Sequence, residues 1–244
     1  MKKINNMIKK GFAVLLDPDK LNPHSLAERI ASVNDSSVDY IFVGGSLISS
    51  DNMDMVLSEL AAKTSVPKIL FPGNSLHVHR GADAILLLSL ISGRNPEFLI
   101  GQHVISAPML KRSGLEILPT GYILVDGGRP TTVSYISNTN PVPADKPDVA
   151  AATALAGEML GLQYIYLDAG SGALFPVREE MIRMVKNTVS VPVIVGGGIR
   201  TAEDARKALS AGADVIVVGN AIEKNPGLLR EISDTVASYN ISLV

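Results

Sequence analysis

Residues 191–221 read VPVIVGGGIRTAEDARKALSAGADVIVVGNA. The apolar run 191–196 leads into Gly197 and Gly198, and after an amphipathic segment the apolar run 215–219 also ends in glycine. Short apolar runs rich in Val and Ile are typical of parallel strands that helices cover on both faces. Glycine suits the turn after such a strand, because it adopts backbone conformations that other residues avoid. This stretch therefore predicts a strand, a helix and a second parallel strand.

The same alternation of apolar runs and amphipathic segments extends through all 244 residues. Eight runs recur at intervals of about thirty residues, as in a (β/α)8 barrel. They occupy residues 12–17, 40–45, 68–72, 84–90, 121–126, 164–168, 191–196 and 215–219. Barrels of this kind routinely reach this length as one domain, so we expect residues 1–244 to form a single α/β domain with the TIM-barrel fold.

Two intervals depart from this rhythm. Residues 73–83 are too few for a full crossover helix with its turns, so we expect a modified barrel in which the helix between strands 3 and 4 is missing or irregular. Residues 127–148 form a long stretch that is rich in Pro, Ser, Thr and Asn. A loop of this kind after a barrel strand predicts a cover over the active site.

Composition limits the kind of protein this is. The formal net charge of -2 and the isoelectric point near 6.1 indicate no clustered positive charge for nucleic acid. The chain has no cysteine, which excludes disulfides and thiolate chemistry and suits a reducing cytoplasm. The apolar stretch 84–91 is far shorter than the roughly 20 residues that span a bilayer, so we expect no stable membrane insertion. A mean hydropathy of +0.25 leaves room for an apolar groove or a buried subunit interface.

The loops after strands 7 and 8 are candidates for a phosphate site. TIM barrels carry their active sites at the C-terminal ends of the strands, and many bind phosphate through backbone N–H groups of these two loops. Here the loops contain Gly197, Gly198, Gly219 and Asn220, and the hydroxyl of Ser171 would complete the cradle. The alternative is that the glycines only permit tight turns between strand and helix.

Asp17 and Ser46 end the first two strands, which are neighbours in a barrel. A carboxylate and a hydroxyl with few other charges suit Mg²⁺, which takes one or two protein oxygens and fills its remaining positions with water and phosphate. The pair therefore predicts a metal and a second phosphate. In the alternative, Asp17 and Asp19 cap the following turn and Ser46 makes a local hydrogen bond.

Asp168 ends the sixth strand, between the two predicted phosphate sites. Its carboxylate could accept a proton from a hydroxyl, although an ordinary Asp is a weak base and would act late in the attack on a very reactive electrophile. The alternative is a structural Asp that caps its loop. His77 and His79 have no partner at metal-ligand spacing, so we expect surface or loop histidines.

Five segments together resemble one known family. They are residues 16–20 (LDPDK), 43–46 (VGGS), 166–172 (YLDAGSG), 195–199 (VGGGI) and 218–221 (VGNA). In order and spacing they closely resemble the geranylgeranylglyceryl phosphate synthase family, with its bacterial heptaprenylglyceryl phosphate synthase relatives. The resemblance implies a modified TIM barrel that lacks a regular third helix. It also implies that a prenyl diphosphate, here expected to be geranylgeranyl diphosphate, is joined to the C3 hydroxyl of sn-glycerol 1-phosphate, forming an ether lipid precursor and releasing pyrophosphate.

The same resemblance implies roles for individual residues. Asp17 and Ser46 would bind Mg²⁺, and Asp168 would take the proton of the glycerol hydroxyl. Many family members have Glu at this position, so the carboxylate of Asp168 is one methylene shorter. A larger set would hold the glycerol phosphate: Tyr166, Leu167, Asp168, Ala169, Gly170, Ser171, Gly172, Gly197, Gly198, Gly219 and Asn220.

The prenyl tail would need an apolar trough. Candidates are Leu86, Leu88, Leu90 and Phe98, each of which suits an ordinary core equally well. Relatives form dimers or larger rings, so we expect a homo-oligomer, either a dimer or a hexamer. Two other functions stay open: another phosphate-binding TIM-barrel enzyme, such as an isomerase or cyclase without a metal–pyrophosphate site, and a non-catalytic barrel that binds a phosphorylated metabolite.

Overall fold

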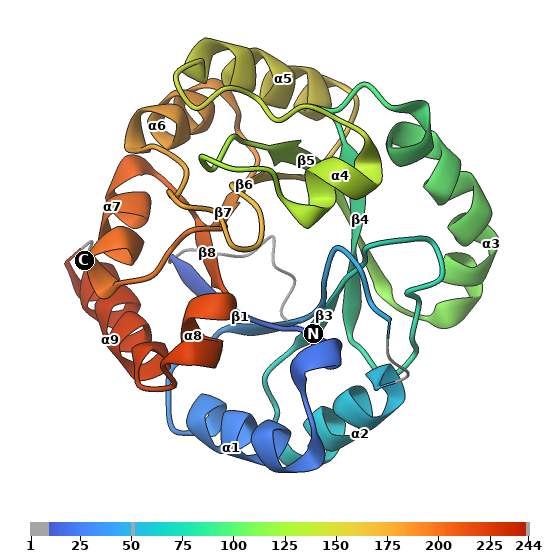
Figure 1. The fold of residues 1–244 in the computed structure, drawn as a ribbon, viewed down its shortest axis with the longest axis vertical. Helices are drawn as coiled ribbons and strands as arrows, with labels where there is room; N and C mark the ends of the chain where they lie inside the picture. Colours follow the sequence, from blue (N-terminus) through green and yellow to red (C-terminus); the bar gives the residue numbers. More distant parts are fainter. Residues whose placement is uncertain (1–9, 50–51, 243–244) are drawn as a thin grey trace.

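Eight parallel strands close into a barrel in the computed structural model, which describes residues 10–49 and 52–242 (Figure 1). The strands follow one another around the barrel in sequence order, and β1 pairs with β8 to close it. They are β1 (Gly11–Leu16), β2 (Tyr40–Gly44), β3 (Lys68–Phe71), β4 (Ala84–Leu90), β5 (Glu116–Leu124), β6 (Tyr164–Asp168), β7 (Val193–Gly196) and β8 (Val215–Val218). The predicted TIM-barrel fold is confirmed.

Helices form a ring outside the strands (Figure 1). The longer helices are α1 (Pro23–Asn34), α2 (Met53–Lys63), α3 (Gln102–Ser113), α5 (Pro147–Met159), α6 (Glu179–Thr188), α7 (Ala202–Ala211) and α9 (Leu228–Ile241). The shorter helical turns are η2 (Pro18–Lys20), η3 (Glu97–Gly101), α4 (Thr132–Ser137) and α8 (Asn220–Lys224). Figure 1 shows α4 and α8 inside the outer ring, where they border the barrel mouth.

The predicted strands agree with the observed ones to within two residues at each end, except for β5. This strand begins at Glu116 instead of residue 121, and it pairs with β4 from Glu116 to Tyr122. Pro119 lies inside the added part. Because Pro is rare within central strands, the sequence pattern there does not suggest a strand.

Both irregular intervals are seen in the structure. Residues 72–83, between β3 and β4, contain no helix, as expected. Residues 125–146, between β5 and α5, form a long excursion that includes α4. A bridge between Val125 and Val142 holds the base of this excursion against the barrel.

Caps in the sequence fix the ends of the helices. The side chain of Asn22 accepts hydrogen bonds from two backbone N–H groups at the start of α1, and Pro23 occupies the first helical position. Thr201 caps α7, and Gly212 ends that helix in a left-handed conformation with φ of 117°. These caps determine where each helix starts and therefore which residues remain in the loops at the mouth.

Strand alternation divides the core into two layers, because successive side chains point to opposite faces of a strand. In β6, Tyr164 and Tyr166 pack in the barrel interior, whereas Ile165 and Leu167 pack between strands and helices. Four interior rings lie with neighbouring centroids 5.5 to 6.4 Å apart: Phe42, Phe71, Tyr122 and Tyr166. The interior below the mouth is therefore packed with side chains.

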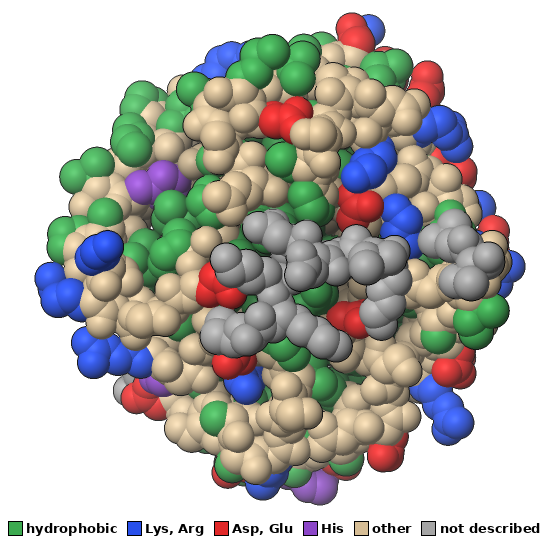
Figure 2. All heavy atoms as spheres, turned by 180° about the vertical axis from the view of Figure 1, so that it is seen from behind, with side chains coloured by type: hydrophobic (Ala, Val, Ile, Leu, Met, Phe, Trp, Pro, Cys, Tyr) green, Lys and Arg blue, Asp and Glu red, His purple; other side chains and the backbone are tan. Residues whose placement is uncertain are grey.

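Exposed hydrophobic side chains gather along η3 and α3. Ile100, Val104 and Ile105 are each more than half exposed. Figure 2, which views the molecule from behind, shows hydrophobic side chains along the edge where α3 lies. Within the described ranges, no helix has both the length and the apolar character needed to cross a membrane.

Candidate functional site

A polar cavity of about 780 Å³ opens at the C-terminal ends of the strands. Its volume lies in the range of roughly 300–1,000 Å³ that is typical of small-molecule sites. All but two of the predicted site residues line it: Asp17, Ser46, Tyr166, Asp168, Gly170, Ser171, Gly172, Gly197, Gly198, Gly219 and Asn220. The loops after five different strands thus meet at one cavity.

The two exceptions are Leu167 and Ala169. Both are fully buried, at 0% exposure, in the layer between strands and helices. Leu167 points outward because it alternates with Tyr166 and Asp168 along β6. The backbone N–H of Ala169 already donates to the carbonyl of Gly196. The structure therefore does not bring these two side chains to the cavity.

The turn after β7 requires glycine. Gly197 and Gly198 have φ values of 76° and 74°, in the left-handed region. A Cβ on Gly197 would lie 2.5 Å from Oδ1 of Asp168, and one on Gly198 would lie 2.6 Å from the carbonyl oxygen of Phe175. Atoms of the loop after β6 and its continuation fill both Cβ positions, so only glycine fits this turn.

Helix α7 starts after this glycine turn and is capped by its own residues. The carboxylate of Asp204 accepts hydrogen bonds from the N–H groups of Arg200 and Thr201, each at 3.1 Å. These two donors are therefore satisfied within the chain. A phosphate near β7 would therefore be bound by the glycine turn. After β8, helix α8 begins at Asn220, the residue that follows Gly219.

Side chains connect the loops across the cavity. Asn220 donates to the hydroxyl of Ser171 at 2.9 Å and accepts from Nζ of Lys20 at 2.9 Å. Lys20 also pairs with Asp17 at 3.3 Å and with Glu223 at 3.1 Å. Burial lowers the pKa of Lys20, but the pairs with Glu223 and Asp17 outweigh it and the pKa is raised. A charged Lys20 therefore lies between Asp17 and the glycine loops.

Asp17 and Ser46 bring hard oxygen atoms to the ends of β1 and β2. Oδ1 of Asp17 accepts the N–H of Asp19 at 3.1 Å, as in the turn-cap alternative, but the side chain keeps 22% exposure in the cavity wall. One carboxylate and one hydroxyl fit Mg²⁺ that takes its other ligands from water and phosphate. In the part of the chain that the structure describes, no three His, Asp or Glu side chains form a fuller metal site.

Asp168 lies at the cavity wall, where it is only 8% exposed. Its Oδ2 accepts a hydrogen bond from the hydroxyl of Tyr122 at 2.6 Å, and its Oδ1 accepts the N–H of Gly170 at 2.7 Å. Burial raises the pKa of this carboxyl, and the two hydrogen bonds lower it part of the way. The result is a carboxylate that is fixed in place and more basic than an exposed Asp.

An apolar groove of about 90 Å³ adjoins the polar cavity. All four predicted trough residues line it: Leu86, Leu88, Leu90 and Phe98. Gly45, Ser46 and Phe71 line both spaces, so the two meet near the ends of β2 and β3. This volume is smaller than that of typical small-molecule sites.

The excursion that was predicted to cover the site borders both spaces. Arg129 and Thr132 line the polar cavity, while Val133 and Ile136 line the apolar groove. One short segment therefore contacts both regions.

Tyr122, Lys20 and Arg129 are site residues that local sequence patterns do not reveal. Tyr122 pairs in register with Tyr166 of the neighbouring strand, so strand alternation combined with register would have indicated that both point inward. Lys20 meets Asn220, which is 200 residues away in the chain. For Arg129, no sequence signal within the aperiodic loop would have indicated its position.

The histidines of the loop 72–83 are not part of the cavity. His77 accepts the N–H of Gly73 at 3.1 Å, and His79 pairs with Asp54. Both are loop residues, as predicted.

The chain is similar to known proteins over almost its whole length. The model of the PcrB family matches residues 5–237. Geranylgeranylglyceryl phosphate synthase from Spirosoma linguale is 59% identical to this chain, and the match covers 97% of this chain and 95% of that protein. The synthase from Chitinophaga pinensis is 57% identical, and the match covers 93% of this chain and 90% of that protein. A crystal structure of (S)-3-O-geranylgeranylglyceryl phosphate synthase from Thermoplasma acidophilum, in complex with sn-glycerol-1-phosphate, has a TM-score of 0.89 at 35% identity and covers 95% of this chain and 94% of that one.

Proposed function

This chain belongs to the PcrB family, and on that premise we propose that it is a prenyltransferase of the geranylgeranylglyceryl phosphate synthase type. It joins a prenyl diphosphate to the C3 hydroxyl of sn-glycerol 1-phosphate, forms an ether lipid precursor and releases pyrophosphate. The observation that carries this proposal is the meeting of the polar cavity and the apolar groove at Gly45, Ser46 and Phe71. The glycerol phosphate needs a polar space, and the apolar tail of the prenyl diphosphate needs an apolar one. The two spaces must meet where the new bond forms.

The glycerol phosphate would lie in the polar cavity. Its phosphate would contact Gly197, Gly198, Gly219 and Asn220, all of which line this cavity. Its C3 hydroxyl would face Asp168, which the hydrogen bond from Tyr122 holds in one orientation. The choice of ligand is supported by the relative from Thermoplasma acidophilum, whose structure contains sn-glycerol-1-phosphate.

The diphosphate would lie near Asp17, Ser46 and Lys20, where the cavity meets the groove. Mg²⁺ held by Asp17 and Ser46 would supply charge neutralisation for the leaving pyrophosphate. Lys20, which is paired with Asp17, would add a second positive charge on the protein side. These groups would favour cleavage of the allylic C–O bond, with the electron pair leaving on pyrophosphate.

Bond formation would then involve Asp168 and the positioned glycerol. The C3 oxygen attacks C1 of the prenyl chain as the carboxylate of Asp168 receives the hydroxyl proton. Because the cation formed from an allylic diphosphate is very reactive, a carboxylate of modest basicity is sufficient. Fixing the two reactants in adjoining spaces supplies much of the rate.

The other phosphate-binding enzymes considered above make no use of the apolar groove. An isomerase or cyclase of a small sugar phosphate needs an acid–base pair around one polar cavity and no lipid site. A barrel that only binds a metabolite would show affinity without turnover, which the experiment below distinguishes.

We also propose a homo-oligomer, a dimer or a hexamer, in a reducing cytoplasm. The exposed Ile100, Val104 and Ile105 support association, since a subunit contact would cover them. The absence of cysteine supports the location. Light scattering of the purified protein over a range of concentrations tests the first point, and a mass of one chain throughout would contradict it.

The decisive experiment incubates the protein with sn-glycerol 1-phosphate and prenyl diphosphates of ten to thirty-five carbons. Parallel reactions contain Mg²⁺ or EDTA, and mass spectrometry identifies the products. We expect a prenylglyceryl phosphate ether in the Mg²⁺ reactions only, with the preferred chain length read from the yields. No ether with any chain would contradict the proposed function.

A further inference from the structure

Arg129 lies in the segment 126–137, which leaves β5 and ends with α4. The carbonyl of Gly127 accepts hydrogen bonds from the N–H groups of Leu174 and Phe175 at 2.8 and 3.1 Å. A Cβ on Gly127 would lie 2.5 Å from Cβ of Ala173. The base of this segment is therefore in close contact with the loop that follows β6, and Arg129 is two residues further on.

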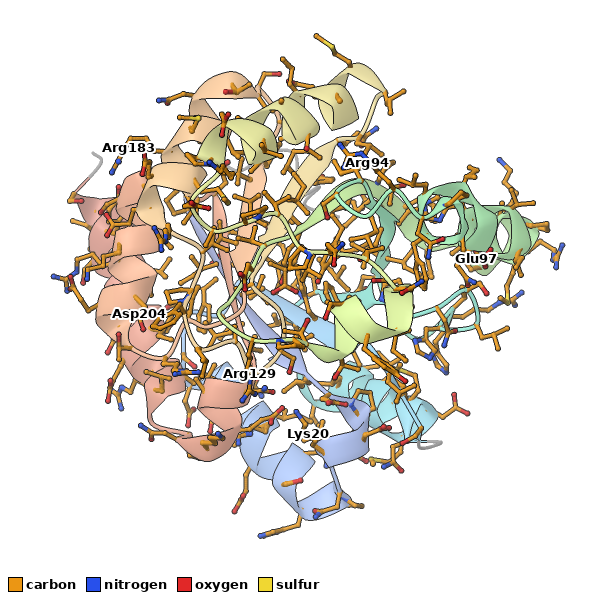
Figure 3. The ribbon with its side chains drawn as sticks, turned by 45° about the horizontal axis from the view of Figure 1, so that its top comes forward. Lys20, Arg94, Glu97, Arg129, Arg183 and Asp204 are labelled. Carbon is orange, nitrogen blue, oxygen red and sulfur yellow. The ribbon has the colours of Figure 1, made fainter. Side chains whose placement is uncertain are left out.

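The guanidinium of Arg129 lies beside Gly172 in the loop that follows β6. A Cβ built on Gly172 would lie 2.5 Å from Nη2 of Arg129, so the guanidinium is next to this glycine. Arg129 and Lys20 line the same cavity, and Figure 3 shows both on the side of the mouth where α8 and η2 lie. The cationic group is thus placed beside the predicted phosphate cradle.

Lys20 and Arg200, two other cations next to the cradle, are occupied. Lys20 is bound by Asp17, Glu223 and Asn220, and Arg200 donates to the carbonyl of Ala173. Arg129, in contrast, makes no ion pair or hydrogen bond with any residue that the structure describes. Lys224 lines the cavity too, but it is the last residue of α8, a turn beyond Asn220.

We propose that Arg129 is a side-chain ligand of the phosphate of sn-glycerol 1-phosphate. This inference rests on the proposed function and adds a specificity-determining residue to it. Guanidinium presents two parallel N–H donors that match two phosphate oxygens, which gives the backbone cradle the charge-assisted contact that it lacks. Arg129 thereby selects a phosphorylated polyol over a neutral one.

The variants Arg129→Ala and Arg129→Lys test this, with Arg183→Ala as the matched control. Arg183 is an exposed arginine on the outer surface of α6 (Figure 3). Calorimetry measures the Kd for sn-glycerol 1-phosphate, and steady-state assays measure kcat and KM. We expect Arg129→Ala to raise both Kd and KM at least tenfold, with a smaller change in kcat. Arg129→Lys should recover part of the lost affinity. Arg183→Ala should behave as the unmodified protein.

Several outcomes would overturn the proposal. One is an unchanged Kd in Arg129→Ala; another is a loss of kcat without a change in KM, which would indicate a role in the chemical step. Circular dichroism checks the fold, and because the side chain is exposed, both variants should fold. If the unmodified protein neither binds nor converts sn-glycerol 1-phosphate, the proposed function fails, and the inference fails with it. Normal binding and turnover with an unaffected Arg129→Ala overturns the inference alone.

Discussion

The hydroxyl of Tyr122 donates a 2.6 Å hydrogen bond to Oδ2 of Asp168 at the point where the barrel interior meets the polar cavity. Burial, together with the nearby Asp168, raises the pKa of Tyr122 well above its ordinary value, so the phenol stays protonated and acts as the donor. The pair holds the carboxylate at one place while burial raises its pKa. A residue that is normally a weak base is thereby oriented and made more basic.

Asp168→Asn should abolish most of the turnover while sparing glycerol phosphate affinity. Asn has nearly the same shape and can still accept the N–H of Gly170, but it cannot take a proton. General bases contribute about a hundredfold or more, so kcat should fall by at least that factor. Steady-state kinetics with calorimetric affinities measure both quantities. Equal losses in kcat and affinity would make Asp168 a binding residue instead of a base.

Tyr122→Phe should move the pH profile. The hydrogen bond from Tyr122 lowers the pKa of Asp168, so its removal raises that pKa further. Activity requires the ionised carboxylate and is lost as pH falls through this pKa, so the acid limb should shift to higher pH. Because this hydrogen bond also fixes the orientation of the carboxylate, its removal should lower kcat as well.

The control for this prediction is Tyr164→Phe. Tyr164 is a buried tyrosine of the same strand as Asp168 but lies at its opposite end. The pH profile of Tyr164→Phe should match that of the unmodified protein. Identical pH profiles for the unmodified protein and Tyr122→Phe would contradict the role assigned to Tyr122.

Asp168→Asn should also stabilise the fold at neutral pH. The pKa of Asp168 is raised in the folded state above its ordinary value of 3.8, so the folded protein binds this proton more tightly than the unfolded chain. The stability that tighter binding of this proton contributes is fully present below pH 3.8. It is lost as the pH rises through the pKa that Asp168 has in the folded protein. At pH 7 the ionised group therefore costs stability, and Asn removes the cost.

Thermal unfolding at two pH values tests this sign. Asp168→Asn should have a higher Tm than the unmodified protein at pH 7. The difference in Tm should disappear below pH 3.8, the ordinary pKa of Asp. A lower Tm at pH 7 would show that the ionised carboxylate contributes more through its hydrogen bonds than it loses by burial.

Much of the barrel and of the candidate site could be predicted from local sequence, since apolar runs mark the strands and polar residues follow them. Asp17, Ser46 and Asp168 stand at the C-terminal ends of strands, where barrel enzymes have their active sites. Their side chains also carry the oxygen atoms that metal binding and proton transfer need. Leu167 belongs to the same segment 166–172 but does not reach the cavity. Side chains alternate along a strand, and this period of two directs Leu167 outward.

The contacts that were not predicted depend on distant parts of the chain. Lys20 meets Asn220 only because β8 closes against β1. Tyr122 meets Asp168 because β5 and β6 pair in one particular register, which the local sequence of either strand does not specify. Arg129 sits in a loop with no periodic pattern, so its position follows from how that loop packs on the next one.

Gly197→Ala should destabilise the fold more than Gly114→Ala. Both positions have left-handed φ, at 76° and 80°. Around Gly114 nothing lies within 4 Å of an added Cβ, so that variant meets only backbone strain of about 1–2 kcal/mol. At Gly197 the same atom would lie 2.5 Å from Oδ1 of Asp168, so a clash adds to the strain. Urea unfolding of both variants measures the difference, and equal losses would show that the turn relaxes freely.

Asp17→Asn should remove Mg²⁺-dependent turnover and leave the fold intact. Asn can still accept the N–H of Asp19, so the turn is kept, but the negative charge that would attract the cation is gone. Asp19→Asn is the matched control, because the carboxylate of Asp19 accepts from the N–H and hydroxyl of Ser49 at 2.7 and 2.8 Å and does not line the cavity. Turnover measured against Mg²⁺ concentration should be flat for Asp17→Asn and saturable for the control. Saturable activity in Asp17→Asn, at the same Mg²⁺ concentrations as in the control, would remove Asp17 from the metal site.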